Sequence, residues 1–178
     1  IGFTGESLAV VTVAQGIVWL VINTWLTYCL TRHLIREQRH RRKWAFAAAL
    51  LVLLSGAAHW GFFNGMETGL FTTVVLAALN AFVANKLGWC TVWLSIAGMT
   101  RPEGLLLTGV ILFGTIAEDI LQRRQLRWRQ TLLISLAIVL GFLPSAVNWM
   151  VTGSPSATGF QAKAWLYNVP AYPKEILN

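Results

Sequence analysis

The stretch LAVVTVAQGIVWLVINTWLTYCL, residues 8–30, contains no charged residue in 23 positions. A helix needs about 20 consecutive apolar residues to cross the hydrocarbon core of a bilayer. Two amide side chains interrupt this run, Gln15 and Asn23, and we expect both to hydrogen-bond to neighbouring helices. The stretch therefore predicts a transmembrane helix, and it places the chain among membrane proteins.

The composition of the whole chain agrees with this prediction. Of its 178 residues, 56% are hydrophobic and only 12% are charged, and the mean hydropathy is +0.59. A soluble domain carries about 25% charged residues. The charges gather in a few clusters that are separated by long uncharged runs. The predicted fold class is therefore all-α, a polytopic bundle of transmembrane helices.

The net charge of +7 comes from two loops. Residues 31–43 contain six basic residues against one acid, and residues 118–130 contain four arginines against two acids. Basic residues that flank apolar spans are typical of cytoplasmic loops, whereas a nucleic-acid-binding domain gathers them on one folded surface. We therefore expect both loops in the cytoplasm, and no nucleic-acid partner.

The apolar runs between the charged clusters predict about six membrane helices. Two of the runs have only 13 residues each, so they are either short spans or the two arms of a re-entrant hairpin. A proline at position 144 predicts a kink in the last helix. The expected helices are residues 8–30, 44–60, 70–85, 87–99, 105–117 and 131–151.

The domain prediction follows from these helices. Residues 1–151 are expected to form the bundle, as part of a larger membrane domain. Residues 152–178 are expected to form an extracytoplasmic segment that leads to a further C-terminal region. Because the chain starts at Ile1, we expect it to be a fragment of a longer protein.

Three polar segments separate apolar runs: FFNGMETG at 62–69, TRPEG at 100–104 and the segment 153–163. With both basic loops in the cytoplasm, the alternation of the helices puts all three segments on the outer side. The protein is thus predicted to be a multi-pass protein of the plasma membrane. Its unusual polar motifs are predicted to face away from the cytoplasm.

Glu67, in the first polar segment, is the candidate catalytic residue. A carboxylate at the outer end of two helices can act as a general base, bind a hydroxyl group or bind a metal ion. Alternatively, it stabilises the start of the helix near residue 70, where the helix dipole favours an acid. His59 lies at the same rim, and His59, Glu67 and Glu103 together are candidate ligands for a divalent cation.

Arg101, Glu103 and Lys163 are, with His59, the candidate substrate-binding residues. A guanidinium group matches the oxygens of a phosphate bidentately, and Lys163 can hold a second phosphate oxygen. Structural alternatives remain for both cations. Arg101 can form an ion pair with Glu103 or Glu67, and Lys163 can be a lysine that extends to the membrane interface.

Taken together, the three segments resemble the bacterial GT-C superfamily of polytopic glycosyltransferases. NGMETGLF at 64–71, TRPEGLL at 100–106, and TGSP at 152–155 followed by QAK at 161–163 are similar to loops of its arabinofuranosyltransferase-like and mannosyltransferase-like members. The resemblance extends from about residue 55 to 165. Those members often have an asparagine shortly after Gly-Ser-Pro, and this chain has Ser-Ala-Thr there, so no specific role is implied for that turn.

The resemblance implies an enzyme that transfers a sugar from a polyprenyl-phosphate donor to a glycan, lipid or protein acceptor. The site would lie at the extracytoplasmic face of the inner membrane, and Glu67, Arg101, Glu103 and Lys163 would line it. The principal acidic base would lie in an outer loop nearer the N-terminus than residue 1. Such a transfer needs cations for the leaving phosphate and a carboxylate for the acceptor hydroxyl.

A non-enzymatic transporter or flippase of a lipid-linked sugar is the alternative function. It would share a cationic outer cavity, but it should also carry polar residues through the middle of the membrane. The candidates for such residues are Gln15, Asn23 and Asn80, and none of them is charged.

Overall fold

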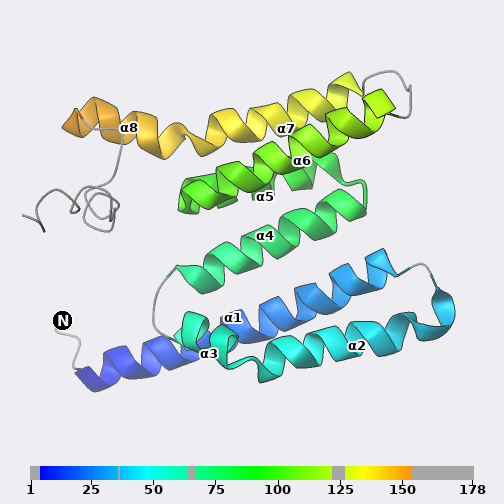
Figure 1. The fold of residues 1–178 in the computed structure, drawn as a ribbon. Coiled ribbons are helices and arrows are strands. Elements are labelled where there is room, and N and C mark those ends of the chain that lie inside the picture. Colours follow the sequence, from blue (N-terminus) through cyan, green and yellow to red (C-terminus); the bar gives the residue numbers. More distant parts are fainter. Residues whose placement is uncertain (1–4, 36, 64–66, 122–126, 154–178) are drawn as a thin grey trace, which may run out of the picture. The chain divides into compact units, whose positions relative to one another are not determined.

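The computed structural model describes residues 5–35, 37–63, 67–121 and 127–153 (Figure 1). The described residues are almost all helical, and they contain no strand, which confirms the predicted all-α class. The helices are α1 (Gly5–Leu34), α2 (Gln38–Leu54), α3 (Gly56–Phe63), α4 (Thr68–Val83), α5 (Leu87–Thr100), α6 (Pro102–Leu121), α7 (Trp128–Gly141) and α8 (Leu143–Thr152).

The chain divides into two compact units, Ile1–Gly141 and Phe142–Asn178. The first unit contains α1 to α7. Of the second unit, the structure describes α8 and Gly153 after it. The assigned helices are interrupted at Phe142, two residues before Pro144, which is where the sequence predicts a kink.

In the first unit the helices pack side by side in an order that differs from the chain order. α2 packs on α1, α1 on α4, and α4 on α5, and α5 then contacts both α6 and α7. Figure 1 shows that the α1–α2 and α4–α5 connections lie at one end of this unit, and that the α5–α6 turn lies at the other end. The α5–α6 turn is therefore separated from the basic hairpin by the length of the helices.

Three helical segments are long and apolar enough to cross a membrane: Ala9–Leu34, Pro102–Leu121 and Trp128–Val151. A fourth is obtained if α2 and α3 are one bent span. α4 and α5 are shorter, with 16 and 14 residues, and α5 at about 1.5 Å per residue is shorter than a hydrocarbon core of about 30 Å. The helices indicate a membrane-embedded protein, but the predicted number of six spans is not confirmed.

The short run predicted at residues 105–117 is in fact part of a full-length helix. α6 has 20 residues and begins at Pro102. Proline is favoured at the first position of a helix, because the N–H that it lacks would have no partner within the helix there. At its other end α6 continues through Glu118 and Asp119 to Leu121. Hydropathy placed these two acids in a loop, but both bind Arg127 after the turn, so the helix can retain them.

The span predicted at residues 44–60 is broken. α2 ends at Leu54, and α3 is inclined to it by 58°. The break is capped from both sides: the N–H of Ala58 donates to Oγ of Ser55 at 3.3 Å, and Nε2 of His59 lies 2.8 Å from the carbonyl oxygen of Leu53. A serine at this position satisfies a free N–H of the new helix, so the chain can bend without leaving these groups unpaired.

Small residues allow the helices of the first unit to approach closely. A Cβ added to Gly98 on α5 would lie 3.0 Å from the Cα of Gly141 on α7. Small side chains are common where membrane helices cross, because they bring the two backbones together. Besides glycines, the small residues of the buried core are Ala45, Ala49, Ala78, Ala81, Cys90, Ala97 and Ala137.

Two asparagines of the apolar runs join α1 to α4. Nδ2 of Asn23 donates to Oγ1 of Thr73 at 2.8 Å and to the carbonyl oxygen of Gly69 at 3.4 Å. Nδ2 of Asn80 donates to the carbonyl oxygen of Leu26 at 3.0 Å. The predicted interhelical role is thus confirmed for Asn23. It is wrong for Gln15, which is exposed and makes no hydrogen bond to a described residue.

We expect Asn23→Ala to lower the free energy of unfolding by about 1 kcal/mol, within the range measured for hydrogen bonds between membrane helices. Gln15→Ala removes an amide from the same helix at an exposed position, and it should change stability by less than about 0.5 kcal/mol. Unfolding of the complete gene product in mixed micelles would measure both. Equal losses in the two variants would contradict the interhelical role of Asn23.

Candidate functional site

Arg101 lies between two carboxylates at one end of the first unit. Its Nε atom is 3.9 Å from Oε1 of Glu67 and 3.8 Å from Oε2 of Glu103. Glu67 immediately precedes α4, and Glu103 belongs to the first turn of α6. The structure therefore brings together three residues that the sequence singled out. It also confirms that the first two polar segments lie on the same side of the bundle.

The position of Arg101 follows from a very short connection between α5 and α6. Arg101 is the one residue between the two helices, and its backbone is extended. Its carbonyl oxygen accepts the N–H of Gly104 at 2.9 Å, and its own N–H donates to Ala97 at 3.0 Å. Gly104 is buried, and a Cβ there would overlap the carbonyl group of Ala97. The glycine thus permits the tight turn that presents Arg101.

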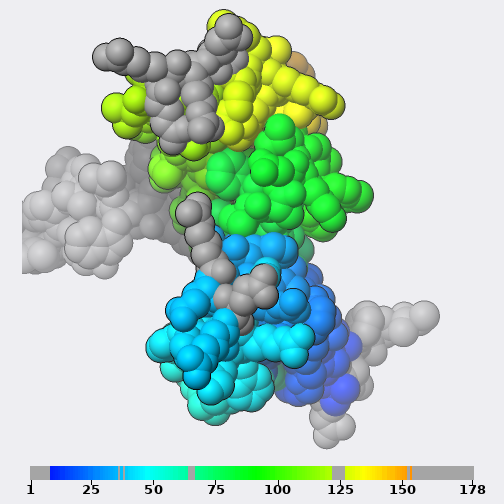
Figure 2. Space-filling view, turned by 90° about the vertical axis from the view of Figure 1, so that its right-hand side faces the viewer, coloured from blue at the N-terminus to red at the C-terminus, as the bar shows by residue number. Residues whose placement is uncertain are grey.

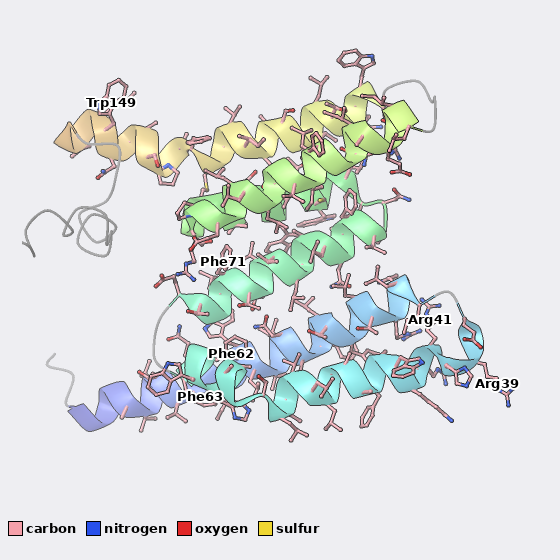
Figure 3. The ribbon with its side chains drawn as sticks, in the orientation of Figure 1. Arg39, Arg41, Phe62, Phe63, Phe71 and Trp149 are labelled. Carbon is pink, nitrogen blue, oxygen red and sulfur yellow. The ribbon has the colours of Figure 1, made fainter. Side chains whose placement is uncertain are left out.

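An aromatic ring also holds the guanidinium group. Cζ of Arg101 is 5.5 Å from the centroid of the Phe71 ring, one turn into α4 (Figure 3). Glu67 occupies the N-cap position of this helix, but its side chain makes no capping hydrogen bond. Its carboxylate interacts with Arg101 instead, as the ion-pair alternative predicted. α4 therefore supplies both a charge and a ring to the arginine.

The arginine retains hydrogen-bonding capacity. The contacts of both carboxylates are to Nε, at distances beyond the usual N–H···O range of about 2.7–3.2 Å. Within the described part of the chain, the side chain of Arg101 makes no hydrogen bond, and it is 32% exposed. A guanidinium group with free terminal amino groups can bind two oxygens of one phosphate. The carboxylates, at 47% and 56% exposure, are accessible to a hydroxyl group.

His59 does not join this cluster. Its Nε2 atom is bound to the carbonyl oxygen of Leu53, and its ring meets Phe63 edge-on with the centroids 6.1 Å apart. The described residues contain no group of three metal-binding side chains. The predicted cation site of His59, Glu67 and Glu103 is therefore not supported. Lys163 lies outside the described residues.

A groove lies beside the cluster, between α1, the α2–α3 break and α4. It has a volume of about 500 Å³ and a mostly apolar wall. Thr68 and Thr72 of α4 line it, and each directly follows a residue that contacts Arg101, namely Glu67 and Phe71. The groove and the charged cluster thus share the first two turns of α4.

Two features were missed by reasoning from the sequence. Asn23 lines the groove as a fully buried residue, and its Oδ1 atom has no hydrogen-bond partner among the described residues. At the other end of the unit, Arg127 binds Asp119 at 2.8 Å and Glu118 at 3.1 Å. The sequence did contain a signal for these ion pairs: two adjacent acids, Glu118 and Asp119, end an apolar run, and an arginine follows shortly after them.

Comparison with protein-family models, with curated proteins and with solved structures finds no match to this chain. The local geometry and the resemblance of the motifs therefore carry the functional interpretation.

Proposed function

We propose that the chain is part of a membrane glycosyltransferase that moves a sugar from a polyprenyl-phosphate donor to a glycan, lipid or protein acceptor. The observation that carries this proposal is the position of Arg101. It lies at the end of an apolar bundle, beside two accessible carboxylates, with terminal amino groups that make no hydrogen bond to a described residue. A donor with a phosphate head and an apolar tail needs this combination.

In the proposed reaction, Arg101 binds the phosphate of the donor. The bond between the anomeric carbon and the phosphate oxygen breaks, and the phosphate takes the electron pair. A bond forms between the anomeric carbon and the acceptor oxygen, and the acceptor proton passes to a carboxylate. Glu67 is the candidate for this role within the chain, and Glu103 would bind sugar hydroxyls. Arg101 stabilises the charge that develops on the leaving phosphate.

The groove beside α4 suits the lipid part of the donor. Its wall is mostly apolar. Two of its lining residues, Thr68 and Thr72, are next in the chain to Glu67 and Phe71, which contact Arg101. A prenyl chain in the groove would place its phosphate near the end of the helix, where Arg101 lies. Lys163 is proposed as a second phosphate ligand, on the motif resemblance alone.

Arg101→Ala is expected to lower the rate of sugar transfer about 100-fold, the usual effect of removing one group that stabilises developing charge. Glu67→Gln should lower it by a similar factor if Glu67 takes the proton. Membranes that contain the complete gene product would be supplied with radiolabelled polyprenyl-phosphate sugars. Transfer to an extractable acceptor would be compared at equal expression. Arg129→Ala is the control, because Arg129 is exposed at the other end of the unit.

Two results would count against the proposal. If Arg101→Ala and Arg129→Ala transfer sugar at the same rate, the Arg101 cluster is only a structural ion pair. If no sugar is transferred and the labelled lipid instead crosses the bilayer, the protein is a flippase. Protection of the buried Cys90 thiol from maleimide would show that the variants remain folded, because Cys90 is fully buried.

A further inference from the structure

The α1–α2 hairpin carries positive charge that the described carboxylates do not neutralise. Arg39, Arg42 and Lys43 are exposed in the first turns of α2. In the described residues no acid forms an ion pair with any of them. Glu37, the one acid among residues 31–43, lies 3.2 Å from Nδ1 of His40 through its Oε1 atom. Three neighbouring cations are therefore free to bind an anion.

The other basic loop differs in this respect. Arg127 is bound to both acids that precede it, Glu118 and Asp119. It also closes the α6–α7 connection through its backbone N–H, which donates to Oδ2 of Asp119 at 3.1 Å. Loop composition alone would give both loops the same role in setting membrane orientation. The pairing separates Arg127 from the hairpin cations, because Arg39, Arg42 and Lys43 lie close together on α2 without an acid partner among the described residues.

A further arginine joins the two helices of the hairpin. Nε of Arg41 donates to the carbonyl oxygen of Arg32 at the end of α1. Cζ of Arg32 in turn lies 5.7 Å from the ring centroid of Tyr28. Arg39, by contrast, points away from the hairpin in Figure 3. Figure 2 looks onto this end of the unit and shows the blue and cyan hairpin at its surface.

An exposed apolar stripe continues directly from the cations. Phe46, Leu50 and Leu53 are 64%, 40% and 41% exposed. They follow Arg39 and Lys43 at the three- and four-residue spacing of one helix face. The buried alanines of α2, Ala45 and Ala49, lie on an adjacent face, and α2 packs on α1. One face of α2 thus passes from positive to apolar along its length.

We propose that this face of α2 binds an anionic phospholipid. The phosphate would lie at Arg39, Arg42 and Lys43, and an acyl chain would lie along Phe46, Leu50 and Leu53. The order of charge and apolar surface matches a lipid, whose charged head and apolar chain are joined. A free phosphate would use the cations but not the stripe. Each basic residue near a membrane surface strengthens binding to an anionic bilayer about fivefold.

A lipid with a photoactivatable acyl chain can test this proposal. The complete gene product would be placed in phosphatidylcholine nanodiscs with a trace of photoactivatable phosphatidylglycerol, and the crosslinked peptides would be mapped by mass spectrometry. We expect crosslinks at residues 46–53 at least about tenfold more often than with a photoactivatable phosphatidylcholine of the same chain. This comparison needs only the wild-type protein.

Matched variants would assign the effect to these cations. Replacing Arg39, Arg42 and Lys43 with glutamine should lower the crosslinking at residues 46–53 about tenfold or more. Replacing Arg123, Arg124 and Arg129 with glutamine removes the same charge from the other loop and should leave it unchanged. The single change Arg39→Gln keeps most of the hairpin charge, so it would serve if the triple variant did not insert correctly, and it should lower crosslinking about fivefold.

Three results would overturn the proposal: equal labelling by the two lipids, equal losses in the two triple variants, or displacement of the anionic lipid by millimolar inorganic phosphate. The last result would assign the cations to a free anion. Lipid binding at α2 does not require sugar transfer, so each of the two proposed activities can fail while the other stands.

Discussion

Gly104→Ala is expected to lower the free energy of unfolding by about 3 kcal/mol, the upper end of the usual range for overpacking. The added Cβ would overlap the carbonyl group of Ala97 and would lie 2.6 Å from the backbone N of Gly98. These are backbone atoms of α5, so they cannot rotate away as a side chain could. The α5–α6 turn would have to open, and Arg101 would move away from Glu67.

Gly109→Ala is the matched control on the same helix. A Cβ at Gly109 meets no atom within 4 Å, so alanine there should stabilise α6 by up to about 1 kcal/mol. Unfolding in mixed micelles would measure the two variants. The rate of maleimide labelling of Cys90 would report the loosening of α5. Cys29, the other cysteine of the chain, would be replaced by alanine so that only Cys90 reacts. Wild-type stability of Gly104→Ala would show that α5 and α6 approach less closely than described.

Hydropathy predicted the all-helical class and long apolar helices, because a helix that crosses a bilayer must be apolar along its length. The uncharged run at 8–30 corresponds to α1, and a candidate span at Ala9–Leu34 contains nearly all of it. Hydropathy failed where a polar group is satisfied by a specific partner. Asp119 is buried in its ion pair with Arg127, so a helix that seemed to end at residue 117 continues to Leu121. The pairing depends on the tertiary fold.

The break at Ser55 was missed for a similar reason. A serine within an apolar run does not by itself indicate a bend, and here the bend also uses His59, which binds the carbonyl oxygen of Leu53. His59 was predicted to belong to the substrate site, and the structure instead assigns it this capping contact. The association of Arg101 with Glu67 and Glu103 was predictable, because alternating spans put both segments on one side. The sequence did not predict whether these three residues form a binding site or a structural ion pair.

Arg127→Ala is expected to be nearly as destabilising as Gly104→Ala, at about 2–3 kcal/mol. The side chain of Asp119 is only 3% exposed, so loss of Arg127 would leave a buried carboxylate without its cation. Breaking a fully buried ion pair by removing one partner costs about 3–5 kcal/mol. We reduce this value because Arg127 is 40% exposed and water screens its charge.

The arginine should support the α6–α7 connection over the whole physiological pH range. Burial lowers the pKa of Arg127, but its hydrogen bonds to Glu118 and Asp119 and their charges outweigh this effect, so the net shift is upward. A base with a raised pKa in the folded state contributes stability at every pH below its ordinary pKa. That stability is lost only when the pH rises through the raised value. Arg127 therefore keeps its proton between pH 6 and about pH 9, well below the ordinary pKa of arginine. Over this range, titration of Arg127 should not reduce the difference in the free energy of unfolding between wild type and Arg127→Ala.

Three further variants would identify the cause of the loss. Arg129→Ala removes an exposed arginine two residues away and should change stability by less than about 0.5 kcal/mol. Arg127→Lys keeps the charge but loses the planar fork that reaches both acids, so it should recover only part of the loss. Adding Asp119→Ala to Arg127→Ala removes the unpaired buried charge and should restore more than half of it. If the double variant is less stable than Arg127→Ala alone, the hydrogen bond from the backbone N–H of residue 127 to Asp119 contributes more than the uncompensated carboxylate costs.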